Sequence, residues 1–193
     1  MIIGLIGAGG LVGQIIIRCI QNDLTFDSHS ICFKLYTQTT KLSESFKIHD
    51  KNYIIERFDL SQLNFINFDF IILATENDVS SEIISYAKLH NLKTRFIDLS
   101  SEFRLENDVP LVIPEVNPED LYNSNIISNI ISNIISSPNC TTTFLVMLLK
   151  AIEPLGFIKR VIVSTYQSAS GAGIKGLNEL KQQATDWVET RNL

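Results

Sequence analysis

Compact apolar segments alternate with amphipathic ones along the first hundred residues of the chain. Four apolar runs are typical of strands buried in a parallel sheet: residues 1–6, 31–36, 68–74 and 94–99. Between them, apolar residues recur at helical spacing in residues 10–21 and 78–89. The expected inward faces consist of Ile16, Ile17 and Ile20 in the first helix and Val79, Ile83, Ile84 and Ala87 in the second. This alternation predicts an α/β fold, a Rossmann-like and mostly parallel sheet with helices on both faces.

Two shorter β-rich segments, 45–48 and 52–56, lie between the second and third apolar runs; they flank a polar turn and predict a hairpin.

The pattern of alternating strands and helices changes after residue 99. Residues 100–139 carry four of the five prolines, and we interpret them as a connection leaving the first domain. The remaining pattern predicts three elements, a helix over 141–152, a strand over 157–166 and a helix over 174–188.

A tandem repeat interrupts the connection. Ser-Asn-Ile-Ile occurs at 124–127, 128–131 and 132–135. Solenoid units are about 20–50 residues long, so a four-residue unit does not build one. We interpret the repeat as an expansion in a loop or an edge strand.

Charge and cysteine content narrow the class of protein. The 193 residues carry a net charge of −5, and 45% of them are apolar, which excludes disorder of the whole chain. No basic excess is present to neutralise phosphates, so we expect no nucleic-acid partner. The three cysteines form no C-x-x-C pair, and they predict neither a disulfide framework nor a zinc site. Free thiols are typical of a reducing compartment.

The very apolar segment 1–20 is not expected to be a signal or membrane helix. It has no basic leading region and no small-residue cleavage site, and five glycines interrupt it. We therefore expect a soluble cytoplasmic protein.

A glycine-rich turn follows the first predicted strand and opens the first predicted helix. Its sequence is Gly7-Ala8-Gly9-Gly10-Leu11-Val12-Gly13. The spacing G-x-G-x-x-G fails at Val12, whereas G-x-x-G-x-x-G holds. Glycines let a backbone approach phosphate closely, and the N–H groups at a helix start attract anionic oxygen. The context predicts a dinucleotide-binding turn.

The end of the second predicted strand indicates which dinucleotide is preferred. NAD enzymes usually place a carboxylate there to hold the ribose hydroxyls. The segment 35–41 has no acidic residue, and its hydroxyls and Lys41 are able to accept a 2′-phosphate. We predict NADP as the cofactor and leave NAD open.

A cysteine stands at the predicted start of the helix after the connection. Pro138 makes a helix unfavourable before that point, so Cys140 falls at or near the helix N-terminus. The positive end of a helix stabilises a thiolate, and backbone N–H groups in the same turn can hold an oxyanion. These are the requirements of a nucleophile that attacks a carbonyl. We expect the other cysteines, Cys19 and Cys32, to be buried core residues.

The whole chain resembles the aspartate-semialdehyde dehydrogenase family. Five motifs occur in the order of that family: GAGGLVG (7–13), DLSSEFR (98–104), VPLVIPEVN (109–117), SPNCTT (137–142) and STYQSASGAG (164–173). The resemblance implies the reductive dephosphorylation of L-aspartyl-4-phosphate to aspartate semialdehyde with NADPH, through a thioester, in the biosynthesis of lysine, threonine and methionine and of diaminopimelate. It also implies a small-molecule substrate, phosphate as the other ligand, and a homodimer for the full-length family.

The resemblance assigns roles to matching residues. Cys140 corresponds to the thioester nucleophile, and Asn139 helps bind phosphate and the developing oxyanion. Arg104 clamps phosphate, and Gln167 orients the amino acid end of the substrate. The cofactor contacts implied are Gly9, Gly10, Leu11, Val12, Ser170 and Gly171, in addition to the turn glycines Gly7 and Gly13. Thr39 and Thr40 stand where the family often has Arg-Ser around the 2′-phosphate.

Two departures from the family accompany these matches. The histidines, His29, His49 and His90, all precede Cys140, and none fits the position of the family's catalytic histidine. The family also continues well beyond Leu193. We therefore expect an NAD(P)-binding domain at 1–136, which includes the connection 100–136, and an incomplete catalytic and dimerisation domain at 137–193. Our hypothesis is a truncated chain that binds dinucleotide weakly and turns over little substrate.

Three alternatives stay open at this point. N-acetyl-glutamyl-phosphate reductases share a DLS…FR segment, but they have glycine before the cysteine and Tyr-Pro after it, unlike Asn139, Thr141 and Thr142 here. Glyceraldehyde-3-phosphate dehydrogenases share a Cys-Thr-Thr turn but lack STYQ and IPEVN. The third alternative is a non-catalytic remnant that only binds nucleotide or pairs subunits.

Overall fold

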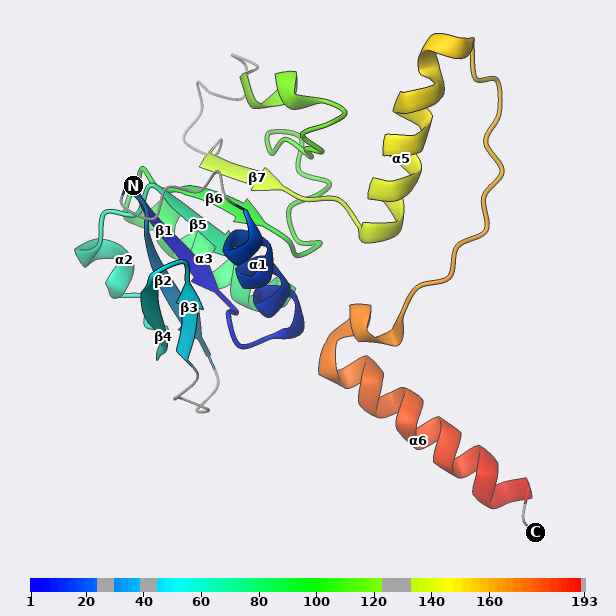
Figure 1. Ribbon diagram of the computed structural model, residues 1–193, viewed down its shortest axis with the longest axis horizontal. Helices are drawn as coiled ribbons and strands as arrows, with labels where there is room; N and C mark the ends of the chain where they lie inside the picture. The colour runs from blue at the N-terminus through cyan, green and yellow to red at the C-terminus, as the bar shows by residue number, and fades with distance from the viewer. Residues whose placement is uncertain (24–29, 39–44, 123–132, 192–193) are drawn as a thin grey trace. The chain divides into compact units, whose positions relative to one another are not determined.

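The computed structural model describes residues 1–23, 30–38, 45–122 and 133–191. These residues fall into two compact units, Met1–Asn139 and Cys140–Leu193 (Figure 1). Within the described ranges, no helix is both long and apolar enough to cross a membrane.

A seven-stranded sheet forms the centre of the first unit in the described part of the chain. The spatial order of its strands is β3-β4-β2-β1-β5-β6-β7. The strands are β1 (Ile2–Ile6), β2 (Cys32–Thr37), β3 (Ser45–Ile48), β4 (Lys51–Arg57), β5 (Phe70–Leu73), β6 (Arg95–Asp98) and β7 (Ile134–Ser136). All neighbouring pairs are parallel except β3 and β4, which form the predicted antiparallel hairpin. The predicted Rossmann-like, mostly parallel sheet is confirmed.

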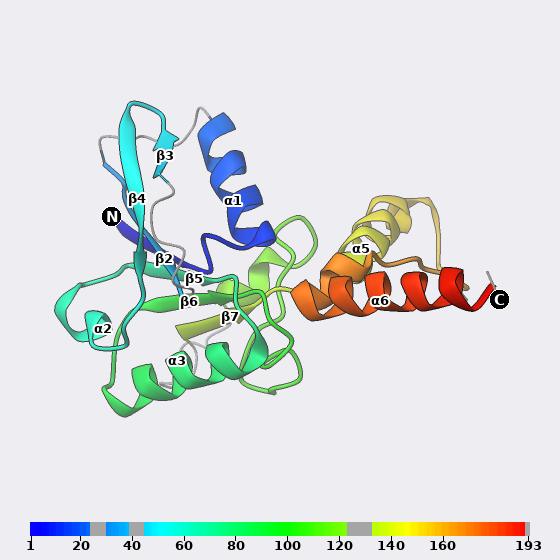
Figure 2. The ribbon, with the colours of Figure 1, turned by 90° about the horizontal axis from the view of Figure 1, so that it is seen from below.

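Helices cover both faces of this sheet, as predicted. Figure 2 shows α1 (Leu11–Asn22) and α3 (Asn77–Leu89) on opposite sides of it; α2 (Gln62–Phe65) is a single short turn. Alternation along the strands divides the core in two. Leu5 and Phe33 pack with Ile17 of α1, whereas Ile6 and Phe96 pack with Ile83 of α3. Full burial of each such side chain contributes about 1.5–3 kcal/mol. The predicted inward faces are confirmed: Ile17, Ile20, Ile83, Ile84 and Ala87 are buried, and Ile16 and Val79 are partly buried.

Strand β7 lies where the sequence predicted either a loop or an edge strand. It begins inside the third unit of the Ser-Asn-Ile-Ile repeat and lies at the edge of the sheet, beside β6. On its other side, Ser136 N donates to Pro110 O at 2.9 Å and Val112 N donates to Ser136 O at 3.0 Å. The third unit therefore lies in an edge strand, one of the two places expected for the repeat. The first two units lie outside the described residues.

In its described residues, the second unit contains two α-helices, two 3-10 turns and no packed core of its own. Its helical elements are α5 (Cys140–Ile152), η3 (Glu153–Leu155), η4 (Ala169–Ala172) and α6 (Gly173–Arg191); a further 3-10 helix, η1 (Pro118–Tyr122), belongs to the first unit. The helices predicted over 141–152 and 174–188 are confirmed. None of the described residues from Cys140 onward is buried.

The strand predicted over 157–166 is wrong. Residues 156–168 run without helix or strand, and Phe157 and Ile162 are 90% and 86% exposed. An apolar, β-branched run forms a strand only where a neighbouring strand accepts its backbone hydrogen bonds. The described residues provide no such neighbour.

The prediction that Cys19 and Cys32 are core residues is also wrong, because both are exposed. The helical period turns Cys19 outward while Ile17 and Ile20 on the same helix are buried. Cys32 is the first residue of β2, outside the buried middle of the strand.

Candidate active site

The residues of interest in the first unit gather at one edge of the sheet. The glycine turn follows β1, Arg104 lies in the turn after β6, and Ser137 follows β7. These strands are parallel, so their carboxyl ends meet at the same edge. Ligands of open α/β sheets bind at that edge.

Two glycines of the turn are required by its own packing. Gly7 has a φ of +94°, and a Cβ there would overlap the carbonyl oxygen of Ala74. A Cβ at Gly13 would overlap the carbonyl oxygen of Gly7. The turn is held to β2 as well, because Gly7 N and Ala8 N both donate to Tyr36 O at 2.9 Å. Gly7 and Gly13 therefore allow strand, turn and helix to approach one another closely.

The other two glycines are exposed. A Cβ at Gly9 would lie 3.5 Å from Thr37 Oγ1, an ordinary contact, so packing does not demand glycine there. Gly10 is the N-cap residue of α1, and because glycine has no side chain it makes no side-chain hydrogen bond to the helix start. Leu11 and Val12 are also more than half exposed. The surface of the turn thus offers glycine backbone and an uncapped helix start, which suits a diphosphate.

Thr37 was not singled out by sequence reasoning. It is the last residue of β2, is buried, and lies beside Gly9. This is the position at which a dinucleotide-binding fold usually places its ribose-binding acid. Thr39 and Thr40, to which the resemblance gave the 2′-phosphate, lie outside the described residues. The sequence signal that could have identified Thr37 is its place at the end of the second predicted strand.

Tyr36 is a structural neighbour of this site. Its ring packs edge-to-face on Phe58 and Phe68, with centroids 5.5 Å and 6.3 Å away. Its hydroxyl makes no hydrogen bond to the residues that the structure describes. Burial, and then the charges of Glu56 and Cys32, raise the pKa of Tyr36 to about 12. The phenol therefore stays protonated at neutral pH and does not act as an acid or base there.

The turn after β6 is fixed by a buried carboxylate. Asp98 is fully buried, and its Oδ2 accepts from Ser100 Oγ at 2.7 Å. Ser100 Oγ in turn accepts from Glu102 N at 3.2 Å. Ser101 N donates to Asn77 Oδ1 at 3.1 Å, which ties the turn to the start of α3. These bonds hold the segment that presents Arg104.

Arg104 itself binds backbone carbonyls. Its Nε donates to Ser137 O at 2.8 Å, and its Nη2 donates to Leu99 O at 3.1 Å. Ser137 N donates to Asp98 O at 2.8 Å. The structure thus brings Arg104 together with the loop that leads to Asn139.

Cys140, predicted at or near a helix N-terminus, is the first residue of α5, and it is exposed. No acidic residue occurs in the first turn of that helix to oppose an anion. Pro138 before it is buried, which fixes the approach of the chain.

A second turn in the Cys140–Leu193 unit gathers three of the predicted residues. Gly171 N donates to Ser168 O at 2.9 Å, and Ser168 and Ser170 share a hydroxyl–hydroxyl bond of 2.7 Å. A Cβ at Gly171 would lie 2.7 Å from Gln167 Nε2, so the side chain of Gln167 lies over this glycine. Gln167, Ser170 and Gly171 therefore belong to one compact turn before α6.

Neither described histidine lies at the carboxyl edge of the sheet. His49 occupies the hairpin turn before β4, and His90 follows α3, where it stacks on Tyr86 at 4.2 Å between ring centroids. Both positions precede strands that run toward the site, so they lie at the opposite edge. The third histidine, His29, lies outside the described residues.

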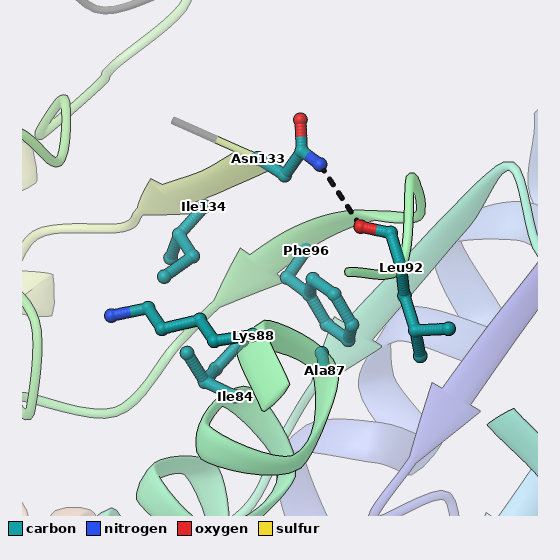
Figure 3. Close-up of a pocket in the computed structure, with 7 residues that line it drawn as sticks. All are labelled: Ile84, Ala87, Lys88, Leu92, Phe96, Asn133 and Ile134. Atoms are coloured by element: carbon teal, nitrogen blue, oxygen red, sulfur yellow. Dashed lines mark hydrogen bonds between the residues drawn. The ribbon is translucent and has the colours of Figure 1, made fainter. Parts of the chain in front are cut away.

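A small apolar pocket also lies away from the site. Figure 3 shows Lys88, Phe96 and Ile134 around it, with Asn133 Nδ2 donating to Leu92 O at 3.3 Å. Leu92 and Asn133 precede β6 and β7, at the amino ends of these strands. The pocket is therefore part of the packing between α3 and the sheet, not of the candidate active site.

Two family models match the chain. The semialdehyde dehydrogenase NAD-binding domain matches residues 2–124, and the semialdehyde dehydrogenase dimerisation domain matches residues 149–193. These two matches cover the glycine turn, Arg104 and the Gln167 turn. Cys140 lies in the interval between them.

Individual relatives agree with the family models. Aspartate-semialdehyde dehydrogenase of Aquifex aeolicus is 32% identical over 191 residues, which are 99% of this chain and 53% of that protein. The Rickettsia bellii enzyme is 35% identical over 184 residues, 94% of this chain and 50% of that protein. The chain thus spans about half the length of these curated relatives.

Solved structures extend the agreement to the fold. Aspartate semialdehyde dehydrogenase II of Vibrio cholerae, complexed with ASA, has a TM-score of 0.73 at 28% identity, covering 98% of this chain and 53% of that one. The resemblance stated from the motifs is confirmed by these relatives and by the family models. The chain belongs to the semialdehyde dehydrogenase family.

Proposed function

We propose that the chain carries the nucleotide-binding turn and the nucleophile of an aspartate-semialdehyde dehydrogenase. One observation supports this most strongly: Cys140 is an exposed thiol at the first residue of α5, and the loop before it is anchored at the carboxyl edge of the sheet. The relatives named above carry that enzyme name, and the Vibrio cholerae structure holds ASA. The substrate class is therefore the 4-phosphate or 4-aldehyde of aspartate.

The glycine turn fits a dinucleotide. Gly9 and Gly10 expose backbone beside an uncapped helix, and Thr37 places a hydroxyl at the end of β2. The diphosphate would lie on the first pair and the adenosine ribose near Thr37. The end of β2 brings no carboxylate to repel a 2′-phosphate, which favours NADP over NAD. The bound cofactor supplies the hydride that reduces an acyl group.

Cys140 supplies the covalent chemistry. Its thiolate sulfur attacks the acyl carbon of aspartyl-4-phosphate, a C–S bond forms, and the C–O bond to phosphate breaks with release of phosphate. Backbone N–H groups at the start of α5 and the Asn139 side chain stabilise the negative charge on the former carbonyl oxygen. After reduction of the thioester, the C–S bond breaks, the sulfur leaves as thiolate, and aspartate semialdehyde is released.

Among the described residues, no histidine lies at the carboxyl edge of the sheet to transfer a proton to or from the Cys140 sulfur. His49 and His90 lie at the amino ends of the strands. A general acid–base typically contributes a factor of about 10² to 10⁴ in rate. We therefore propose that this chain alone becomes acylated at Cys140 but turns over slowly.

Acylation can be measured without turnover. The full chain is mixed with aspartyl-4-phosphate, and its intact mass and peptide masses are followed. We expect one acyl group on Cys140 and release of one phosphate, with no acyl group on Cys19 or Cys32, which are also exposed and serve as internal controls. N-acetyl-glutamyl-phosphate is the comparison substrate. Faster acylation by it would assign the chain to the other reductase, and no acylation by either would leave a non-catalytic module.

Self-association through the second unit is the accompanying proposal. The dimerisation-domain model matches residues 149–193, and Leu155, Ile174 and Trp187 in that range are all more than half exposed. We propose that two copies of the chain cover these side chains. Sedimentation of the chain across a concentration series tests this, since a monomer at all concentrations contradicts it.

A further inference from the structure

We propose that Arg104 is a positioning residue, in addition to any contact that it makes with phosphate. Its guanidinium holds the carboxyl ends of β6 and β7 together and thereby fixes the backbone that leads into Cys140. The proposal rests on the proposed function, because it concerns the loop that presents the nucleophile.

The two acceptors of Arg104 have equivalent places in the fold. Leu99 is the first residue after β6, and Ser137 is the first residue after β7. Each carbonyl lies just past the end of its strand, where the sheet provides no further neighbour. Arg104 Nε reaches Ser137 O at 2.8 Å and Nη2 reaches Leu99 O at 3.1 Å. One side chain thus satisfies two strand ends that are far apart in the sequence.

This contact requires the geometry of arginine. The guanidinium holds several N–H groups in one plane, whereas the lysine ammonium is a single point charge on a flexible stem. Arginine therefore offers a separate nitrogen to each of the two carbonyls, Nε to Ser137 O and Nη2 to Leu99 O, and lysine has only one nitrogen for both. The third nitrogen, Nη1, makes no hydrogen bond to the residues that the structure describes. It is the nitrogen that remains for a phosphate oxygen, so one guanidinium can serve both roles.

The hydrogen bond from Arg104 to Ser137 acts on the backbone shortly before Cys140. Ser137 lies after the repeat and three residues before Cys140. Ser137 N donates to Asp98 O at 2.8 Å, so both backbone groups of Ser137 are held from the β6 side. Asp98 and Ser100 in turn fix the segment from which Arg104 projects. The start of the Cys140 loop is therefore set by contacts to β6, independently of the length of the connection before it.

The experiment compares Arg104→Lys and Arg104→Met with Arg95→Lys in the full chain. Arg95 lies at the start of β6, over the ring of Phe70 at 5.7 Å, away from the loop. Hydrogen exchange of the amides of residues 136–140 is the first measurement. Both Arg104 variants are expected to exchange there about tenfold faster, roughly the effect of one lost hydrogen bond, while amides of β1 are unchanged. Arg95→Lys is expected to leave residues 136–140 as they are.

The rate of Cys140 alkylation as a function of pH is the second measurement. If Arg104 acts by position, Lys and Met displace the midpoint of this curve alike, whereas Cys19 in the same chain is unaffected. A midpoint that Lys preserves and Met displaces, with unchanged exchange at 136–140, would show that only the positive charge matters and would overturn the proposal. Unchanged exchange in both variants would overturn it too.

Failure of the proposed function gives a different result. In that case Cys140 of the unsubstituted chain is alkylated no faster than Cys19, whatever Arg104 does. Exchange at 136–140 still reports whether Arg104 holds the loop. If Arg104→Met unfolds the first unit, the amides of β1 exchange rapidly as well, and Arg104→Lys, which keeps the charge and the length of the stem, decides the question.

Discussion

The two units of the chain use similar apolar content in opposite ways. All the buried apolar side chains of the described residues lie between Ile3 and Pro138, in the first unit. From Cys140 onward none is buried, although α5 contains Phe144, Leu148 and Ile152. Helical or β-rich patterning therefore yields a core only where a second apolar surface faces it. The first unit has a sheet between two helices, and the second has helices with no layer of their own beneath them.

The difference assigns stability and adaptability to separate parts of the molecule. Large exposed apolar areas on a protein mark surfaces that other surfaces cover. The first unit holds the glycine turn and Ser137 by hydrogen bonds to its own strands and turns. In the second unit, residues 149–193 match a dimerisation domain.

Hydrogen exchange should show the largest contrast between the units. Amides of β1 and β5 are expected to exchange roughly a thousandfold or more slowly than amides of residues 157–168, because the former open only with the core. Mass spectrometry of peptides from the native chain measures this, with the urea-unfolded chain as the reference. Strong protection of 157–168 at high dilution would contradict the comparison.

Matched isoleucine substitutions test it through stability. Ile71 is fully buried in the centre of the sheet, and Ile162 is 86% exposed. Ile71→Ala should lower the free energy of unfolding by about 3–4 kcal/mol, since it leaves a cavity, whereas Ile162→Ala should change it by less than about 0.5 kcal/mol. Urea titration followed by circular dichroism gives both values. Equal losses would mean that residues 157–166 are packed in solution.

Two glycines of the turn separate folding from binding inside the first unit. Gly7→Ala should cost roughly 3 kcal/mol, because its φ of +94° is strained for alanine and the new methyl overlaps Ala74 O. Gly9→Ala should leave stability within about 0.5 kcal/mol and weaken NADPH binding several-fold, because a methyl projects where the diphosphate approaches. Urea titration and NADPH fluorescence measure the two effects. Undiminished NADPH binding by Gly9→Ala would place the dinucleotide elsewhere.

Alkaline pH should reveal the buried phenol. Burial raises the pKa of Tyr36 to about 12 in the folded state, above the ordinary tyrosine value of 10.0, so the folded state keeps a proton that the unfolded state loses. Stability should therefore fall as pH rises from about 10 to 12, by up to about 2.5 kcal/mol from this group. Tyr36→Phe should remove that part of the loss. Tyr166→Phe, at a side chain 98% exposed, is the matched control, and identical curves for the wild-type chain and Tyr36→Phe would contradict the assignment.

The elements predicted correctly from the sequence are those whose packing partners also have a clear hydrophobic pattern. For example, the apolar face of α3 contains Ile83 and Ile84, and it packs on the apolar strand β5 in one core. Strand β7 is only three residues long and lies inside a repeat, so no periodicity marked it. The strand predicted over 157–166 failed for the converse reason, since its composition is right but no partner strand is described.

In the candidate site, too, local features were predictable from the sequence and long-range contacts were not. Local sequence placed Cys140 at a helix start, because Pro138 limits where that helix can begin. The contact between Arg104 and Ser137 joins residues 33 apart in the chain, and no local pattern encodes it. Thr37 required the observed end of β2 and the position of Gly9, which only the fold brings together.

Because the repeat extends into β7, the loss or gain of one repeat unit leaves the sequence of this strand unchanged. Each unit ends in Ile-Ile followed by serine, so loss or gain of one unit by in-frame slippage offers β6 the same tripeptide, at the same number of residues from Cys140. A shift of four residues also preserves which side chains face each side of the sheet. Copy-number variants of this stretch are therefore expected to differ in the length of a connection and to keep the loop before Cys140 unchanged.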